Sequence, residues 1–196
     1  MLGTGLEALQ VASPKIIRTS STGARTAFAE WLGVEFRAGI KLVILEGLTS
    51  SGKTTLTKQP FTLDGRLSTN IGMDDFLPPN LPHDETPYLA AIDLSAMVEE
   101  VEKALREPSL VILQGAIVWP AVESVTARLG VNDVRRVYLK RMAHLIPDFW
   151  ADEDFIFDPE WWPPTGFHRS IYRYHAEQGP WQKCDLVIER IEQKSL

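Results

Sequence analysis

The chain has 196 residues, of which 44% are hydrophobic and 23% charged, with a formal net charge of −6. This length fits one domain with its own core, and the acidic balance argues against a protein that coats nucleic acid or anionic lipid. The single cysteine, Cys184, excludes an intramolecular disulfide and a cysteine-based zinc cluster. Without a membrane-length apolar run or a signal-peptide pattern, we expect a cytoplasmic protein that binds neither nucleic acid nor membrane.

The first part of the chain combines a leader, a helix and a strand. Residues 1–22 indicate a loose leader. The apolar residues of 23–32 recur at helical spacing, and this pattern predicts a helix. Residues 41–46 form an apolar run rich in branched side chains that ends at Gly47, which is typical of a buried strand.

The next segment is expected to be less regular. A short helix should begin near Lys53 and end before Pro60, because proline disrupts a helix interior. A weaker strand is predicted over 68–73. The stretch 76–87 holds four prolines and therefore indicates a loop.

Helices and strands alternate through the middle of the chain. The spacing predicts a helix over 94–106, a strand over 110–113, a helix over 120–129 and a strand over 134–139. Such alternation is typical of an α/β fold with a mainly parallel sheet. Right-handed crossovers would then place the strand-to-helix turns along one edge, where ligands bind.

The last part of the chain contains a predicted lid. Residues 143–166 are rich in proline and acidic side chains, and we expect them to form a long loop that closes over a ligand. A helix over 166–178 and a final strand over 185–189 complete the expected elements. A single domain over 23–196 is therefore predicted.

The strongest motif is a phosphate-binding loop. Residues 47–54 read Gly-Leu-Thr-Ser-Ser-Gly-Lys-Thr and match G-x-x-x-x-G-K-[ST] at every fixed position, between a predicted strand and a predicted helix. Such a loop points backbone N–H groups at phosphate oxygens, Lys53 reaches the β- and γ-phosphates, and Thr54 offers a hydroxyl to Mg²⁺. The dipole of the following helix would also attract the negatively charged phosphates. The residues expected to bind the nucleotide are Gly47, Thr49, Ser50, Ser51, Gly52, Lys53, Thr54 and Thr55.

A pair of carboxylates follows the predicted second strand. Asp74 and Asp75 should lie at the same sheet edge as the phosphate loop. A carboxylate there can accept a hydroxyl proton during phosphoryl transfer or hold Mg²⁺ through water. Solvated loop acids or a turn cap are the alternative interpretation. In an extended segment the two side chains would point to opposite sides, so only one would face the γ-phosphate.

These motifs together resemble the uridine kinase and nicotinamide riboside kinase group of P-loop kinases. The similarity lies in the phosphate loop, in Asp74-Asp75-Phe76, in the Leu-Val-Ile-Leu-Gln-Gly run of 110–115 and in the Tyr/His/Pro segment 172–180. The resemblance implies a three-layer sandwich around a five-stranded parallel sheet, ATP with Mg²⁺, and γ-phosphoryl transfer to a hydroxyl. It also implies an aspartate as acceptor base: Asp75 is our first choice, with Asp74 as the alternative and as a metal ligand beside Thr54.

The chain departs from the group in three ways. Gln114 stands where the group has a glutamate, and Pro60 shortens the helix behind the loop. The predicted lid is acidic and aromatic, whereas related kinases usually place arginines there. Transfer needs a cation beyond Lys53 and Mg²⁺. The expected sources are Arg141, Arg169 and Arg173, although each taken singly also fits a surface position.

The acceptor site is less defined by sequence. Aromatic residues near the predicted ligand edge that could stack on a flat ring are Phe76, Tyr88, Trp119, Trp150, Trp161 and Trp162. The four histidines show no metal-ligand spacing, and Cys184 is predicted to lie in the core.

The sequence therefore predicts a kinase for a small hydroxyl-bearing, nucleoside-like metabolite, with a nucleoside triphosphate as donor. A GTPase would need an Asn/Thr-Lys-x-Asp motif, which is absent. The alternatives are an antibiotic- or other small-molecule-directed phosphotransferase on the same fold, and a non-catalytic nucleotide-binding regulatory protein.

Overall fold

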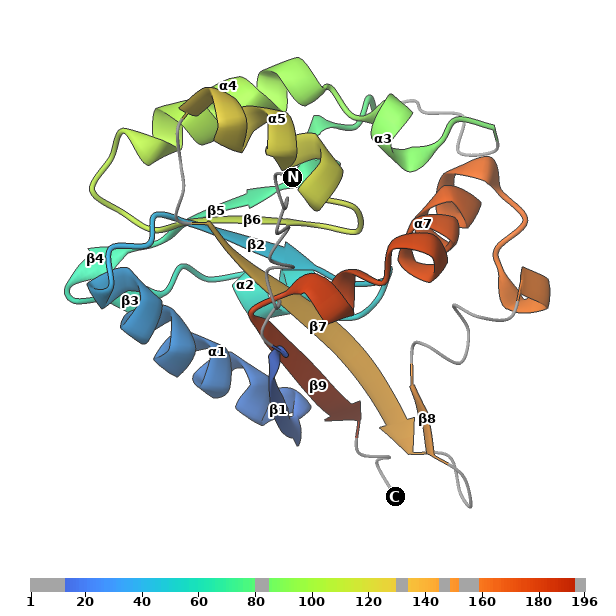
Figure 1. Ribbon diagram of the computed structural model, residues 1–196, viewed down its shortest axis with the longest axis horizontal. Helices are drawn as coiled ribbons and strands as arrows, with labels where there is room; N and C mark the ends of the chain where they lie inside the picture. Colours follow the sequence, from blue (N-terminus) through green and yellow to red (C-terminus); the bar gives the residue numbers. More distant parts are fainter. Residues whose placement is uncertain (1–12, 80–84, 130–133, 145–148, 152–158, 193–196) are drawn as a thin grey trace, which may run out of the picture.

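The computed structural model describes residues 13–79, 85–129, 134–144, 149–151 and 159–192. A central sheet has the strand order β1-β9-β7-β2-β6-β5, and every neighbouring pair along this path is parallel (Figure 1). Strand β8 pairs antiparallel with β7. The strands are β1 (Lys15–Ser20), β2 (Leu42–Glu46), β5 (Thr69–Gly72), β6 (Val111–Gly115), β7 (Val134–His144), β8 (Phe149–Ala151) and β9 (Leu186–Glu192).

Helices cover both faces of this sheet and make a three-layer sandwich (Figure 1). Leu42 and Ile44 of β2 pack with α3 (Tyr88–Ala91), α4 (Leu94–Leu105), α5 (Trp119–Leu129) and α7 (Gly166–Gln178). Val43 and Leu45 point to the other face and pack with α1 (Ser21–Arg37) and α2 (Lys53–Thr57). The alternation of side chains along β2 therefore divides the core into two.

The expectation of an α/β fold with a mainly parallel sheet is confirmed, but the predicted number of five strands is wrong. Six strands form the parallel path, because β1 adds to the edge of β9 in parallel register. Residues 15–20 were expected to belong to a loose leader. Their strand lies at an edge with Ile16 exposed and Ile17 packed on the core, so it lacks the continuous apolar run of a buried strand.

A two-stranded hairpin was also missed. Strands β3 (Thr62–Leu63) and β4 (Arg66–Leu67) pair antiparallel around Asp64-Gly65. Both turn residues have positive φ, at 46° and 79°. Asp-Gly is a favoured sequence for such a two-residue turn, and that signal was present in the chain.

The remaining elements follow the predicted order, with shifted ends. The helix expected near Lys53 ends at Thr57, which agrees with the early stop predicted from Pro60. Strand β7 continues to His144, and its last residues pair with β8, so the start of the expected lid over 143–166 belongs to the sheet. Residues 145–148 and 152–158 of that segment lie outside the described ranges.

The strand order has a switch point between β2 and β6, which is the position where ligands bind in folds of this class. The chain leaves β2 toward β5 on one side, whereas it leaves β6 toward β7 on the other side of β2. Connections that run in opposite directions open a crevice at the carboxyl ends of neighbouring parallel strands. The phosphate loop follows β2 directly and therefore lies at this point.

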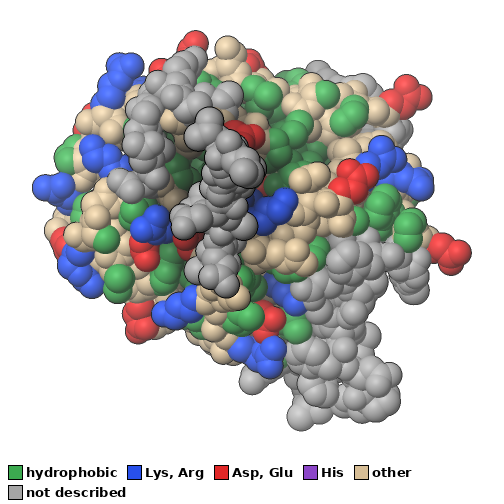
Figure 2. Space-filling view, in the orientation of Figure 1, with side chains coloured by type: hydrophobic (Ala, Val, Ile, Leu, Met, Phe, Trp, Pro, Cys, Tyr) green, Lys and Arg blue, Asp and Glu red, His purple; other side chains and the backbone are tan. Residues whose placement is uncertain are grey.

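The surface shows no large region of one charge among the described side chains that Figure 2 displays. Basic and acidic side chains are interspersed over this face. None of the helices in the described ranges is long and apolar enough to cross a lipid bilayer.

Candidate functional site

The loop after β2 folds tightly around the ammonium group of Lys53. Its Nζ donates hydrogen bonds to the carbonyl oxygens of Gly47 at 2.8 Å and Leu48 at 2.9 Å, and to Ser51 Oγ at 3.4 Å. Ser50 and Gly52 adopt positive φ values of 66° and 98°. The sequence motif therefore has the compact turn that it predicts, with its cation held inside.

Gly47 is required by close packing rather than by its backbone angles. A Cβ at this position would overlap the carbonyl oxygen of Leu139 on β7 and crowd Ser51 Oγ. The loop is thereby pressed against the neighbouring strand. Any larger residue at position 47 would displace the loop.

A cavity of about 510 Å³ lies beside this loop. It joins segments that follow β2 and β5 to helix α7 and to the end of β9. Its polar lining residues are Thr49, Ser50, Gly52, Lys53, Thr54, Thr55, Asp74, His168 and Arg190, and its less polar ones are Leu77, Tyr88, Ala116, Phe167 and Ile171. Among the predicted nucleotide-binding residues, Gly47 and Ser51 shape the loop from behind, and Ser51 is fully buried.

The two aspartates point to different places. Both lie in a 3₁₀ turn, Met73–Phe76, rather than in the extended segment that we expected. Asp74 lines the cavity of the phosphate loop, and its Oδ1 accepts a hydrogen bond from Tyr88 Oη at 2.7 Å. Asp75 lines a neighbouring hollow with Phe76 and Asp93. The structure therefore brings Asp74 rather than Asp75 to the phosphate loop, which reverses our order of preference for the base.

Tyr88 is fixed as the donor in its bond to Asp74. Burial raises the pKa of the Tyr88 hydroxyl well above its ordinary value, and the negative charge of Asp74 raises it further. The ring is buried and meets Phe167 of α7 edge to face. Tyr88 thus orients the carboxylate of Asp74, an exposed residue, at the cavity.

Arg190 is a second basic residue that lines the cavity with Lys53, and it was not predicted from the sequence. Arg190, in strand β9, lies so close to Gly52 that a Cβ there would overlap its Nη1. Of the predicted arginines, Arg169 and Arg173 are exposed on α7. The residues of α7 that line the cavity are Phe167, His168 and Ile171. Arg141 is the register neighbour of Arg190 on β7. The sequence signal that could have indicated Arg190 is its position as a basic residue near the end of the last parallel strand.

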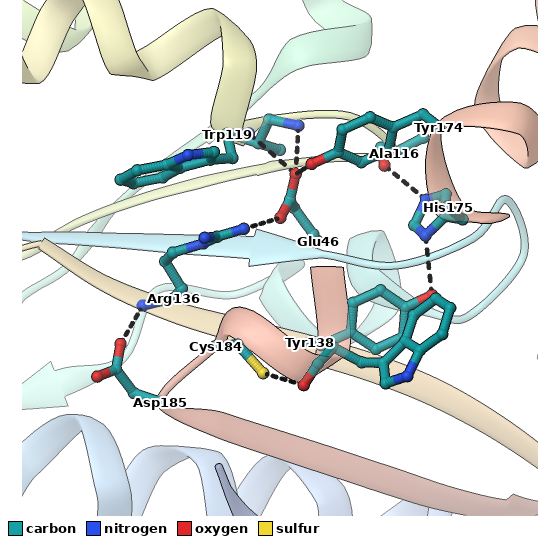
Figure 3. A network of polar contacts seen from close by, with 11 residues as sticks. Glu46, Ala116, Trp119, Arg136, Tyr138, Tyr174, His175, Cys184 and Asp185 are labelled. Carbon is teal, nitrogen blue, oxygen red and sulfur yellow. Dashed lines mark hydrogen bonds and ion pairs between the residues drawn. The ribbon is translucent and has the colours of Figure 1, made fainter. Parts of the chain in front are cut away.

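Glu46 forms a second polar centre directly before the loop (Figure 3). Its Oε1 accepts hydrogen bonds from the backbone N–H groups of Val118 at 2.8 Å and Trp119 at 2.9 Å, and from Tyr174 Oη at 3.1 Å. Its Oε2 lies 3.5 Å from Nη2 of Arg136. Burial raises the pKa of the Tyr174 hydroxyl, and the charge of Glu46 adds to that shift.

His175, next to Tyr174 on α7, is fully buried and neutral. Burial lowers its pKa from 6.5 to about 3. Its Nε2 lies 2.9 Å from the carbonyl oxygen of Ala116, and its Nδ1 lies 3.0 Å from Tyr138 Oη. Because a carbonyl only accepts, Nε2 carries the proton and Nδ1 accepts from the tyrosine. His175 is therefore a core residue, as is Cys184, whose pKa burial raises to about 12.

The predicted aromatic residues are dispersed. Tyr88 lines the cavity, Phe76 lines the neighbouring hollow, and the ring of Trp119 packs on the Arg136 guanidinium at 4.3 Å. Phe167, which was not among the predicted aromatic residues, also lines the cavity. Trp162 is half-buried and is not among the described lining residues. The side chains of Trp150 and Trp161 lie outside the described part of the structure.

The donor set of the cavity fits a hard cation that is also bound by phosphate. Thr54 and Asp74 supply a hydroxyl and a carboxylate to the same cavity. Mg²⁺ uses oxygen ligands of this kind and is usually bound by one or two carboxylates together with substrate phosphates. Within the described ranges, no group of three or more His, Cys, Asp or Glu residues is arranged to hold a metal.

No protein-family model matches this chain, and comparisons with curated proteins and with solved structures found no match.

Proposed function

We propose that this protein is an ATP-dependent phosphotransferase that moves the γ-phosphoryl group to a hydroxyl of a small, nucleoside-like metabolite. The observation that carries the proposal is that Lys53 and Asp74 line one cavity. A phosphate-binding cation and a carboxylate base are the two groups that transfer to a hydroxyl requires. Resemblance of the sequence motifs to the uridine kinase group supports the same reaction.

The nucleotide end of the cavity is the phosphate loop. Lys53 Nζ, which donates to the carbonyls of Gly47 and Leu48, would exchange these partners for the β- and γ-phosphates. Arg190 adds a second positive charge beside Gly52. Helix α2 has only five residues, so its dipole is small, and the charges of Lys53 and Arg190 with the loop N–H groups supply most of the affinity.

The acceptor end lies around Asp74. The Asp74 carboxylate would take the hydroxyl proton as the acceptor oxygen bonds to the γ-phosphorus and the bond to the β-phosphate oxygen breaks, which leaves ADP. Tyr88 orients this carboxylate through its hydrogen bond of 2.7 Å. Phe167 and Ile171, both buried, supply an apolar surface of the cavity that an acceptor could contact.

Thr54 and Asp74 are the residues that would hold Mg²⁺. When bound, the ion neutralises charge on the β- and γ-phosphates during transfer. Asp74 fits a second role here, because its Oδ1 accepts from Tyr88 and a carboxylate has a second oxygen that could accept from water on the ion.

Turnover measurements test the proposal. We expect purified protein with ATP and Mg²⁺ to form ADP only when a suitable alcohol is added, and a panel should include nucleosides, hydroxyl-bearing antibiotics and sugars. Phosphorylated acceptor detected by mass spectrometry identifies the substrate. Binding of ATP without turnover across the panel would instead favour the alternative of a nucleotide-binding regulatory protein, which Gln114 in place of a carboxylate also favours.

A further inference from the structure

Glu46 connects the phosphate loop to the helix that bears the opposite wall of the cavity. We infer that Glu46 and Tyr174 are positioning residues that couple nucleotide binding at the loop to the ordering of helix α7. The inference rests on the proposed function, because it requires a nucleotide in the loop. It adds a means by which donor binding prepares the acceptor side.

The contacts of Glu46 all cross between elements of the fold (Figure 3). Val118 and Trp119 lie at the start of α5, where backbone N–H groups have no partner within the helix. The Glu46 carboxylate satisfies both groups and also bonds Tyr174 of α7 and pairs with Arg136 of β7. Because Glu46 is only 2% exposed, its charge needs these partners.

The loop that follows Glu46 must change its hydrogen bonds when phosphate enters. Lys53 Nζ donates to the carbonyls of Gly47 and Leu48, and phosphate oxygens compete for the same ammonium protons. Gly47 is also covalently bonded to Glu46. A rearrangement of the loop therefore acts first on the residue whose side chain reaches α5, α7 and β7.

Helix α7 has an anchored half and a cavity half. Tyr174 and His175 bind Glu46, Ala116 and Tyr138. The residues one to two turns earlier, Phe167 and Ile171, line the cavity. Since both groups belong to one helix of 13 residues, the anchor at Tyr174 sets the position of the cavity wall.

Hydrogen exchange with and without the non-hydrolysable ATP analogue AMP-PNP and Mg²⁺ tests this coupling. In the parent protein we expect the analogue to slow amide exchange in residues 47–57 and, by about tenfold, in 166–178, within the usual range of coupling between sites. In Tyr174→Phe the loop should keep its protection while that of α7 falls to less than about twofold. Tyr172→Phe, which removes another hydroxyl from the same helix, should behave like the parent.

Each other outcome overturns a stated claim. If Tyr174→Phe retains the protection of α7, or if the parent protects the loop but not α7, the coupling is absent and the proposed function stands. If calorimetry and exchange detect no binding of the analogue to the parent, the proposed function fails, and the coupling fails with it. If Tyr174→Phe does not fold, Glu46→Gln provides the test of the coupling. This variant removes the charge of Glu46 and should likewise reduce the protection of α7 by the analogue.

Discussion

Tyr88 donates a hydrogen bond of 2.7 Å to Asp74, so that a buried aromatic ring fixes the orientation of a carboxylate in the cavity of the phosphate loop. Asp75, the next residue, has no part in that cavity's described lining. The pair therefore provides a comparison in which two adjacent acids of the same size differ mainly in the direction of their side chains.

Replacing Asp74 should slow transfer strongly, whereas replacing Asp75 should not. Asp74→Asn keeps the size and loses proton acceptance, which typically lowers the rate by about 10²–10⁴-fold. Initial rates of ADP formation with the identified acceptor measure this loss, and Asp75→Asn is the matched control. If Asp74→Asn had a normal rate and Asp75→Asn a reduced rate, Asp75 would be the base.

Lys53→Ala should weaken nucleotide binding, and because Lys53 bonds the loop carbonyls it should loosen the loop while the sheet and helices stay folded. Hydrogen bonds to charged groups contribute about 1.5–3 kcal/mol, which corresponds to a loss of about 10–150-fold in affinity for ATP with Mg²⁺. Isothermal calorimetry measures the affinity, and circular dichroism checks the fold. Lys58→Ala removes an exposed lysine just after the same short helix and should bind normally. Equal affinity of Lys53→Ala and the parent would exclude the loop as the phosphate site.

Arg190→Gln should also weaken ATP binding, and its effect should depend on salt. Arg190 lines the cavity beside Gly52, so its loss removes a positive charge near the phosphates. We expect about a tenfold loss at low ionic strength, and a somewhat smaller loss in 0.5 M salt, because Arg190 is half-buried and salt screens its attraction for phosphate only in part. Arg173→Gln changes an exposed arginine of α7 and should leave the affinity unchanged. If Arg173→Gln weakened ATP binding and Arg190→Gln did not, the cation predicted from the sequence, Arg173, would be the one that contacts phosphate.

His175 should make stability depend on pH in a defined window. Burial lowers its pKa from 6.5 to about 3, so the folded chain keeps it neutral while the unfolded chain takes up a proton below pH 6.5. This contribution to the free energy of unfolding is fully present above pH 6.5 and declines as pH falls toward 3, by about 1.4 kcal/mol per pH unit. Urea unfolding of the parent and of His175→Gln should show a shallower slope for the variant. His168→Gln, at a half-exposed histidine, is the control, and equal slopes for His175→Gln and the parent would contradict the assignment.

Features that depend on local pattern could be predicted from the amino-acid sequence alone. The branched apolar run at β2 and the spacing of Gly47, Gly52 and Lys53 predicted a strand, a tight turn and a short helix in that order. These features depend on backbone freedom and on neighbouring residues, so a short window of sequence contains their cause. The alternation of helices and strands likewise predicted the class of fold.

Contacts between side chains that are distant in the sequence could not be predicted in this way. The sequence Asp74-Asp75 does not indicate which acid lines the cavity with Lys53, because that depends on a 3₁₀ turn and on Tyr88, which belongs to another element. Arg190 reaches Gly52 only because β9 joins the same parallel sheet. Contacts of this kind arise from register and packing across the whole chain, and therefore no local pattern contains them.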